Sequence, residues 1–222
     1  FERPQDVTVT TTGEVWVADL HRLQRFAPDG SLLALLPWPP PATAGGGSPT
    51  ADGSGGRLAA APDGGVAAAL PDGRIWRLDG DGQVRNAWTS AADSTADTRG
   101  PSDVAVLSDG SVIVTHQGEQ GRLSPEGQLM AERRFGGLGH EFTAAPDRLA
   151  AAADGGLLTL EGGVVMRRDA DGRPLGSWPV SGMSDGRDIA AAPDGSVFVQ
   201  RAGSQDGSGT LLHFSAAGGL LG

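Results

Sequence analysis

The stretch from Val7 to Leu36, VTVTTTGEVWVADLHRLQRFAPDGSLLALL, contains four short runs of strand-forming residues separated by turn signals. Gly13 joins the first two runs, whose alternating pattern is typical of a hairpin. Pro28-Asp29-Gly30 joins the last two in a tight reversal. The stretch therefore predicts a four-stranded antiparallel sheet, which must be covered or repeated because an isolated sheet exposes two edges.

This pattern recurs down the chain. The first strands of five units are expected to start near Asp6, Arg57, Asp103, Arg148 and Asp188, at intervals of 40 to 51 residues. Four strands per unit at this spacing is the sequence signature of a β-propeller. We predict an all-β chain forming a single domain over residues 1–222, with five four-stranded blades. The expected blades are residues 6–36, 57–88, 103–135, 148–178 and 188–222, with a long Pro/Gly-rich loop at 37–56.

Strand order separates the connections into two faces. In an up-and-down blade, the turns between strands one and two and between strands three and four share one side. The predicted turns on that side are all tight, whereas the other side has the long connections 37–56, 89–102, 136–146 and 179–187. Variable loops on a rigid scaffold often carry function, so we expect any binding site on this long-loop face. Tolerated insertions are the alternative explanation.

The residues at the starts of the first strands alternate in charge: Asp6, Arg57, Asp103, Arg148 and Asp188. We expect them to form a charged ring at the mouth of the propeller channel. A closed ring of five would place Asp188 beside Asp6, and like charges there are unfavourable. A sixth blade absent from this sequence, or a ring closed by another element, would separate them. An incomplete six-bladed ring thus remains an alternative to five blades.

Two further columns recur in the repeats. The third strands carry Arg25, Arg77, Arg122, Arg167 and His213. We expect outward or inter-blade cations here, paired with acidic neighbours or the adjacent turn. A polyanion site is the alternative. Trp88 and Trp178 occupy equivalent positions near the ends of fourth strands, where packing is favoured over ligand stacking. The Ala-rich first strands fit the crowded centre of a propeller.

Composition limits the partners and the location. The net charge of −10 argues against nucleic acid or an anionic membrane as partner, and no long apolar run predicts membrane insertion. All 17 basic residues are arginine and cysteine is absent, and together with the many Ala and Gly residues this indicates a GC-rich bacterial source. The chain starts at Phe1, so we expect a removed leader or a longer protein. Both fit an extracytoplasmic (periplasmic, secreted or cell-surface) location.

The first unit resembles the NHL-type repeat. The matching segments are PQDVTV at 4–9, GEVWVAD at 13–19, RLQRF at 22–26 and PDG at 28–30, and later units match in part. The resemblance implies a β-propeller, commonly six-bladed, with relatives that include protein-binding scaffolds, lactonases and lyases. Related lactonases hold a metal with Glu, Asn and Asp, whereas the single Asn of this chain, Asn86, lies in a predicted fourth strand. Fold alone does not choose among these functions.

Histidines supply the alternative to a binding role. Lyase relatives use loop-face histidines with a metal, and His21, His116 and His140 are predicted on that face. Their spacing within any one segment is not that of metal ligands, so we predict no metal and no cofactor. The candidate binding residues on the long-loop face are His21, Trp38, His116, Glu119, His140 and Glu141.

No catalytic signature emerges from these patterns. We therefore expect a non-catalytic binding or assembly module, an extracytoplasmic scaffold that contacts a protein partner or larger complex through its long-loop face. A metal-dependent hydrolase or lyase using the loop-face histidines is the alternative. The residues indicate no particular small-molecule ligand.

Overall fold

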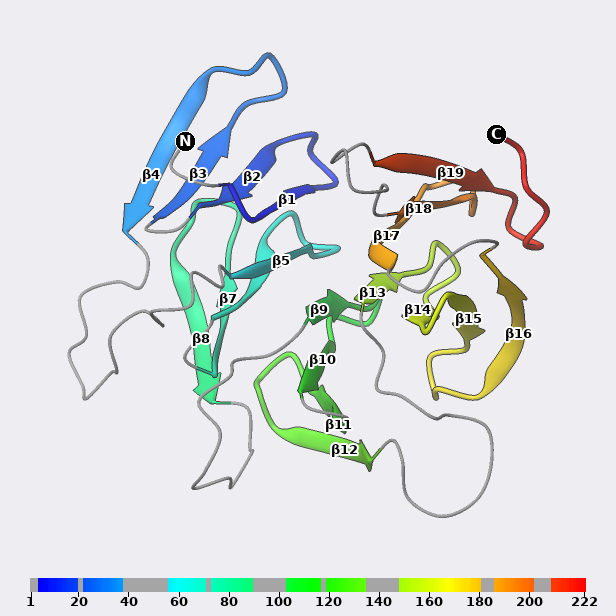
Figure 1. Cartoon of the computed structure of the whole chain (residues 1–222). Coiled ribbons are helices and arrows are strands. Elements are labelled where there is room, and N and C mark those ends of the chain that lie inside the picture. Colours follow the sequence, from blue (N-terminus) through cyan, green and yellow to red (C-terminus); the bar gives the residue numbers. More distant parts are fainter. Residues whose placement is uncertain are drawn as a thin grey trace.

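The computed structural model describes residues 4–19, 22–37, 56–70, 73–89, 103–116, 119–134, 148–180, 186–201 and 209–222, which form strands and turns. Five antiparallel sheets surround a common centre, each with its first strand innermost (Figure 1). The predicted all-β propeller of five blades is thereby confirmed.

Each blade is an up-and-down sheet with its strands in sequence order. Blade 1 has β1 (Asp6–Val9), β2 (Val15–Ala18), β3 (Arg22–Phe26) and β4 (Leu32–Pro37). Blade 2 has β5 (Arg57–Ala60), β6 (Val66–Ala69), β7 (Arg74–Leu78) and β8 (Val84–Thr89). Blade 3 has β9 (Asp103–Val106), β10 (Val112–His116), β11 (Glu119–Leu123) and β12 (Leu129–Arg134). Blade 4 has β13 (Arg148–Ala151), β14 (Leu157–Glu161), β15 (Val164–Arg168) and β16 (Pro174–Pro179).

Blade 5 has three strands: β17 (Gly186–Ala191), β18 (Val197–Arg201) and β19 (Thr210–Phe214). After a turn that ends at Gly218, a single antiparallel bridge joins Phe214 to Leu220. This bridge takes the place of the full fourth strand that the repeat pattern predicts for residues 188–222.

The tight turns share one hydrogen-bonding pattern. In blade 2, the amide of Gly64 donates to the carbonyl of Ala61 at 3.1 Å, and the Asp63 carboxylate accepts from the amide of Gly65 at 3.1 Å. Gly64 has a φ of 84°, a left-handed conformation that favours glycine. Asp therefore fixes the turn while Gly permits it, which explains the repeated Asp-Gly signal.

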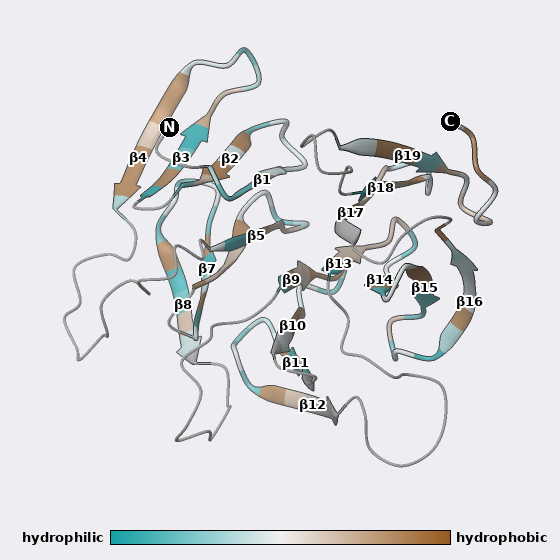
Figure 2. Ribbon diagram, in the orientation of Figure 1, coloured by the Kyte–Doolittle hydropathy of each residue, from teal (hydrophilic) through white to brown (hydrophobic). Residues whose placement is uncertain are grey.

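Apolar side chains fill the junctions between successive blades. Trp16 is fully buried between blades 1 and 2 with Leu23 and Leu58, and β2 and β4 of blade 1 are largely hydrophobic (Figure 2). Small residues also let neighbouring blades approach closely, as the buried Ala67 and Ala69 of β6 do at the junction of blades 2 and 3. Equivalent clusters lie between blades 2 and 3, blades 3 and 4, and blades 4 and 5.

The two outer tryptophans pack against the following blade, as predicted. A Cβ at Gly127 would meet the Trp88 ring at 3.1 Å, and a Cβ at Gly218 would meet the Trp178 ring at 2.6 Å. Each tryptophan of one blade thus lies on the glycine turn between the third and fourth runs of the next. The equivalent placement of these residues is therefore a packing feature.

We expect Gly218→Ala to lower the free energy of unfolding by about 2 kcal/mol, because it combines a φ of 85° with a clash against Trp178. Gly30→Ala is a matched control, since Gly30 has a φ of 84° but no heavy atom within 4 Å of the added Cβ. Its expected cost is about 1 kcal/mol. Urea denaturation measures both; equal losses would show that the contact with Trp178 contributes nothing.

Candidate functional site: the charged ring at the channel mouth

The first strands bring the five alternating charges to one end of the channel. Asp6, Arg57, Asp103 and Arg148 are the first residues of β1, β5, β9 and β13, and Asp188 lies within β17. These inner strands pack against one another in sequence, from β1 to β17. The tight turns follow the ends of the first strands, so the ring lies at the opposite end, on the long-loop face.

Two ring aspartates fasten one blade to the next. Asp6 accepts a hydrogen bond from the Leu58 amide of blade 2 at 2.8 Å. Asp103 accepts one from the Leu149 amide of blade 4 at 2.7 Å. In each case the other carboxylate oxygen accepts the amide of the residue that follows the aspartate. Both carboxylates therefore have a structural role at the channel mouth.

Burial dominates the electrostatics of these aspartates. It raises the pKa of Asp103 to about 7, although two amide hydrogen bonds and the charge of Arg148 act in the opposite direction. Burial also raises the pKa of Asp6, and the negative charge of Asp188 adds to this effect. The carboxyl group of Asp6 thus interacts unfavourably with those of both Asp103 and Asp188.

Asp188 differs from the other two aspartates. One of its oxygens accepts the Ile189 amide at 2.9 Å, which repeats the local bond seen at Asp6 and Asp103. Among the contacts of the described residues, its second oxygen has no hydrogen bond to another blade. Asp188 is therefore a ring carboxylate without the inter-blade bond that its counterparts make.

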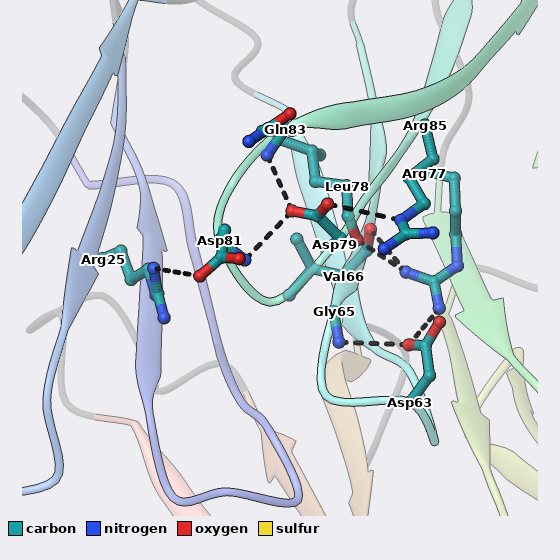
Figure 3. Close-up of polar contacts among 10 residues, drawn as sticks. All are labelled: Arg25, Asp63, Gly65, Val66, Arg77, Leu78, Asp79, Asp81, Gln83 and Arg85. Atoms are coloured by element: carbon teal, nitrogen blue, oxygen red, sulfur yellow. Dashed lines mark hydrogen bonds and ion pairs between the residues drawn. The ribbon is translucent and has the colours of Figure 1, made fainter.

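The four third-strand arginines lie on the opposite, tight-turn face and are paired with carboxylates, as predicted. Arg25 bonds Glu14 at 2.8 Å, and Arg122 and Arg167 bond aspartates of their own turns at 2.6 and 2.8 Å. Figure 3 shows Arg77 against the turn residue Asp63 in the same way. Carboxylates of the protein thus neutralise these guanidinium groups. The recurrence of arginine at this position is therefore explained without a polyanionic ligand.

Three of these arginines also reach the following blade. Arg122 donates to the carbonyl of Ala170 at 2.6 Å, and Arg167 donates to the carbonyl of Ala216 at 2.9 Å. Arg25 lies 4.0 Å from the carboxylate of Asp81, across the junction of blades 1 and 2 (Figure 3). The inter-blade contacts expected for this column are thus present, although Arg122 and Arg167 meet backbone carbonyls of the next blade. A groove of about 310 Å³ opens beside Arg167 between blades 4 and 5.

Most of the loop-face candidates fall outside the description. His21, Trp38, His140 and Glu141 lie outside the described residues. His116 ends β10 and is paired in register with Glu119 at the start of β11, which places this backbone pair at the ring end of blade 3. Within the described ranges, no group of three or more His, Cys, Asp or Glu residues could hold a metal ion. No helix in these ranges is long and apolar enough to cross a membrane.

Comparisons with known proteins identify the architecture. No protein-family model matches the chain, and no curated protein matches it at a significant level. Among solved structures, a streptogramin B lyase is similar at a TM-score of 0.62 with 16% identity, over 92% of this chain and 66% of that chain. Virginiamycin B lyase from Staphylococcus aureus gives 0.60 and 16%, over 99% of this chain and 83% of that chain.

A protein of unknown function from Bacteroides caccae is also similar, at a TM-score of 0.61 and 15% identity, over 98% of this chain and 80% of that chain. At these identities the likeness establishes the fold alone. The chain is thus a β-propeller, and its function has to be inferred from its own residues.

Proposed function

We propose that this propeller is a non-catalytic binding or assembly module, extracytoplasmic and bacterial, that contacts a protein partner through its long-loop face. The observation that carries the proposal is the charged ring on that face, which has three aspartates and two arginines. Asp6 and Asp188 are neighbours without an arginine between them in the ring order. A cationic side chain of a partner would relieve their repulsion.

The overall charge favours the same class of partner. At −10, the chain attracts cationic surfaces at long range, and complementary charges speed association. A rigid scaffold with its long connections at the ring end supplies a surface of the kind that binds proteins. These features support a cationic protein segment as the ligand of the channel mouth.

Asp188→Asn tests the role of the ring. In a tagged chain isolated from its source, we expect this change to reduce the amount of co-isolated partner by about tenfold or more. The reason is that the ion pair between Asp188 and a cationic side chain of the partner is lost. Glu126→Gln removes the same charge from an exposed tight turn and should leave the partner unchanged. Asp188 makes no described hydrogen bond to another blade, so thermal unfolding should show both variants folded. Equal retention of the partner by both variants would contradict the proposal.

A metal-dependent hydrolase or lyase is the second candidate, favoured by the likeness to the two lyase structures. It uses His21, His116 or His140 at the long-loop face. Metal analysis and assays of the chain with a streptogramin B substrate, before and after alanine substitution of each histidine, distinguish the candidates. Turnover that one of these substitutions abolishes would establish the lyase, whereas a binding module should be indifferent to all three.

A further inference from the structure

Four of the five junctions between blades contain a buried apolar cluster. Within the described part of the chain, none of these clusters joins blade 5 to blade 1. β17 and β1 also lack the extensive packing that links the other neighbouring inner strands. The sector between blades 5 and 1, called the open sector below, therefore differs from every other junction.

The side of blade 5 that faces the open sector is uncovered. Strand register aligns Leu211 with the third-strand residues Leu23, Ile75, Gln120 and Val165 of the other blades. Each counterpart is at most 9% exposed, because the next blade covers it, whereas Leu211 is 62% exposed. Blade 5 thus presents an apolar residue where its counterparts support a following blade.

Blade 1 is uncovered on the matching side. Val7 follows the ring residue of its first strand, as Leu58, Val104, Leu149 and Ile189 do in the other blades. These four are between 2 and 6% exposed against the preceding blade, but Val7 is 58% exposed and the nearby Val9 57%. Exposed apolar side chains from both neighbours, Leu211 of blade 5 and Val7 and Val9 of blade 1, therefore lie at the open sector.

The polar contacts of blade 5 also differ from those of the other blades at this junction. Asp6 and Asp103 each bond an amide of the next blade, while Asp188 makes no such bond among the described contacts. His213 occupies the column of Arg122 and Arg167, which reach the next blade, yet its buried Nε2 has no hydrogen-bond partner. Asp188 and His213 are thus two groups of blade 5 without the inter-blade contacts of their counterparts.

We propose that the open sector binds a blade-like, four-stranded antiparallel sheet of a partner protein, whose innermost strand begins with arginine or lysine. The alternating ring supplies the charge argument, since a cation in this position would lie between Asp188 and Asp6. A second copy of this chain fits poorly, because its Arg-led blades 2 and 4 are already enclosed on both sides. The inference that the sheet comes from a partner rests on the proposed assembly function. The inference that the open sector accepts a blade is independent of that function.

A copy of residues 148–180, appended after Gly222 through a flexible glycine–serine linker, serves as the probe. This blade is led by Arg148 and naturally follows an aspartate-led blade. The chain has no cysteine, so Val7→Cys and Leu211→Cys each report on one wall of the sector by their rate of maleimide labelling. Val84→Cys, exposed on the peripheral strand β8, is the control.

We expect both reporters to react rapidly in the unfused chain and about tenfold or more slowly in the fusion, as expected for protected sites. Val84→Cys should be unaffected, and changing the copied Arg148 to Glu should restore part of the labelling. Slow labelling in the unfused chain, in a monomer or in a self-associated form seen by sedimentation, would overturn the proposal. So would rapid labelling both in this fusion and in a second one carrying residues 57–89.

The source of the sheet is tested separately on the tagged chain from its natural source. Leu211→Asp should lose the partner, while Leu129→Asp, on an exposed outer strand, should keep it. Another combination is slow labelling in the fusion while no co-isolated protein is lost with Leu211→Asp. That combination would refute a partner protein as the occupant of the open sector. The open sector itself would stand in that case. A partner that is lost with Asp188→Asn but kept with Leu211→Asp would leave the proposed assembly function standing, whereas a partner kept by both variants would contradict that function as well.

Discussion

Trp16→Ala is expected to lower the free energy of unfolding by about 3–5 kcal/mol. Trp16 is 0% exposed and fills the junction between blades 1 and 2, where it contacts the turn glycine Gly82 and lies beneath the Arg25 guanidinium. Its removal leaves a cavity that the surrounding sheets cannot close, because both are held in register by their backbone hydrogen bonds.

Urea denaturation followed by circular dichroism measures this loss. Leu129→Ala is the control, because Leu129 is half exposed on the outer strand β12 and should change stability by less than about 0.5 kcal/mol. A loss below about 1 kcal/mol for Trp16→Ala would show that the junction of blades 1 and 2 is not a stabilising core.

Between pH 4 and 7, the stability of the protein is expected to fall as the pH rises, mainly because of Asp103. Its pKa is raised from 3.8 to about 7 in the folded state, so the folded protein holds a proton that the unfolded chain releases. Stability decreases wherever the folded state binds more protons and the pH increases. At 1.36 kcal/mol per pKa unit, the full effect is up to about 4 kcal/mol. Asp6 acts in the same direction.

Asp103→Asn should flatten this dependence between pH 4 and 7 in urea denaturation. Asp154→Asn is the control, because its hydrogen bond with Arg167 lowers the pKa of Asp154 and therefore adds stability above pH 4 that is lost at lower pH. This control should lower the stability above pH 4 by a constant amount and change the slope of the profile only below about pH 4. A wild-type profile that rises from pH 4 to 7 would contradict the role assigned to Asp103.

The fold was predictable because its signals are local. Gly64 and its repeats need a left-handed backbone, and each strand is signalled by β-forming residues that alternate with small or polar ones. The turns and blades therefore follow from neighbouring residues. The ring could also be anticipated, since equivalent residues of repeated blades meet at the axis. The paired role of Arg122 and Arg167 followed from their acidic turns.

Other features depend on how blades are placed against one another. The raised pKa of Asp103 reflects burial between blades 3 and 4, which no single repeat encodes. The exposure of Leu211 is similarly invisible in its own strand, since its counterparts have the same pattern but a neighbour on that side. The repulsion of Asp188 and Asp6 was predictable from charge order alone, whereas the uncovered walls beside them were not.

Native mass spectrometry of the protein isolated from its source tests the binding function most directly, because it records intact mass, co-purifying chains and bound metal together. The proposed function predicts a stable complex with a second, different protein, and this complex would identify the partner. A metal-bearing monomer with no associated chain would contradict it and direct attention to the histidines of the long-loop face.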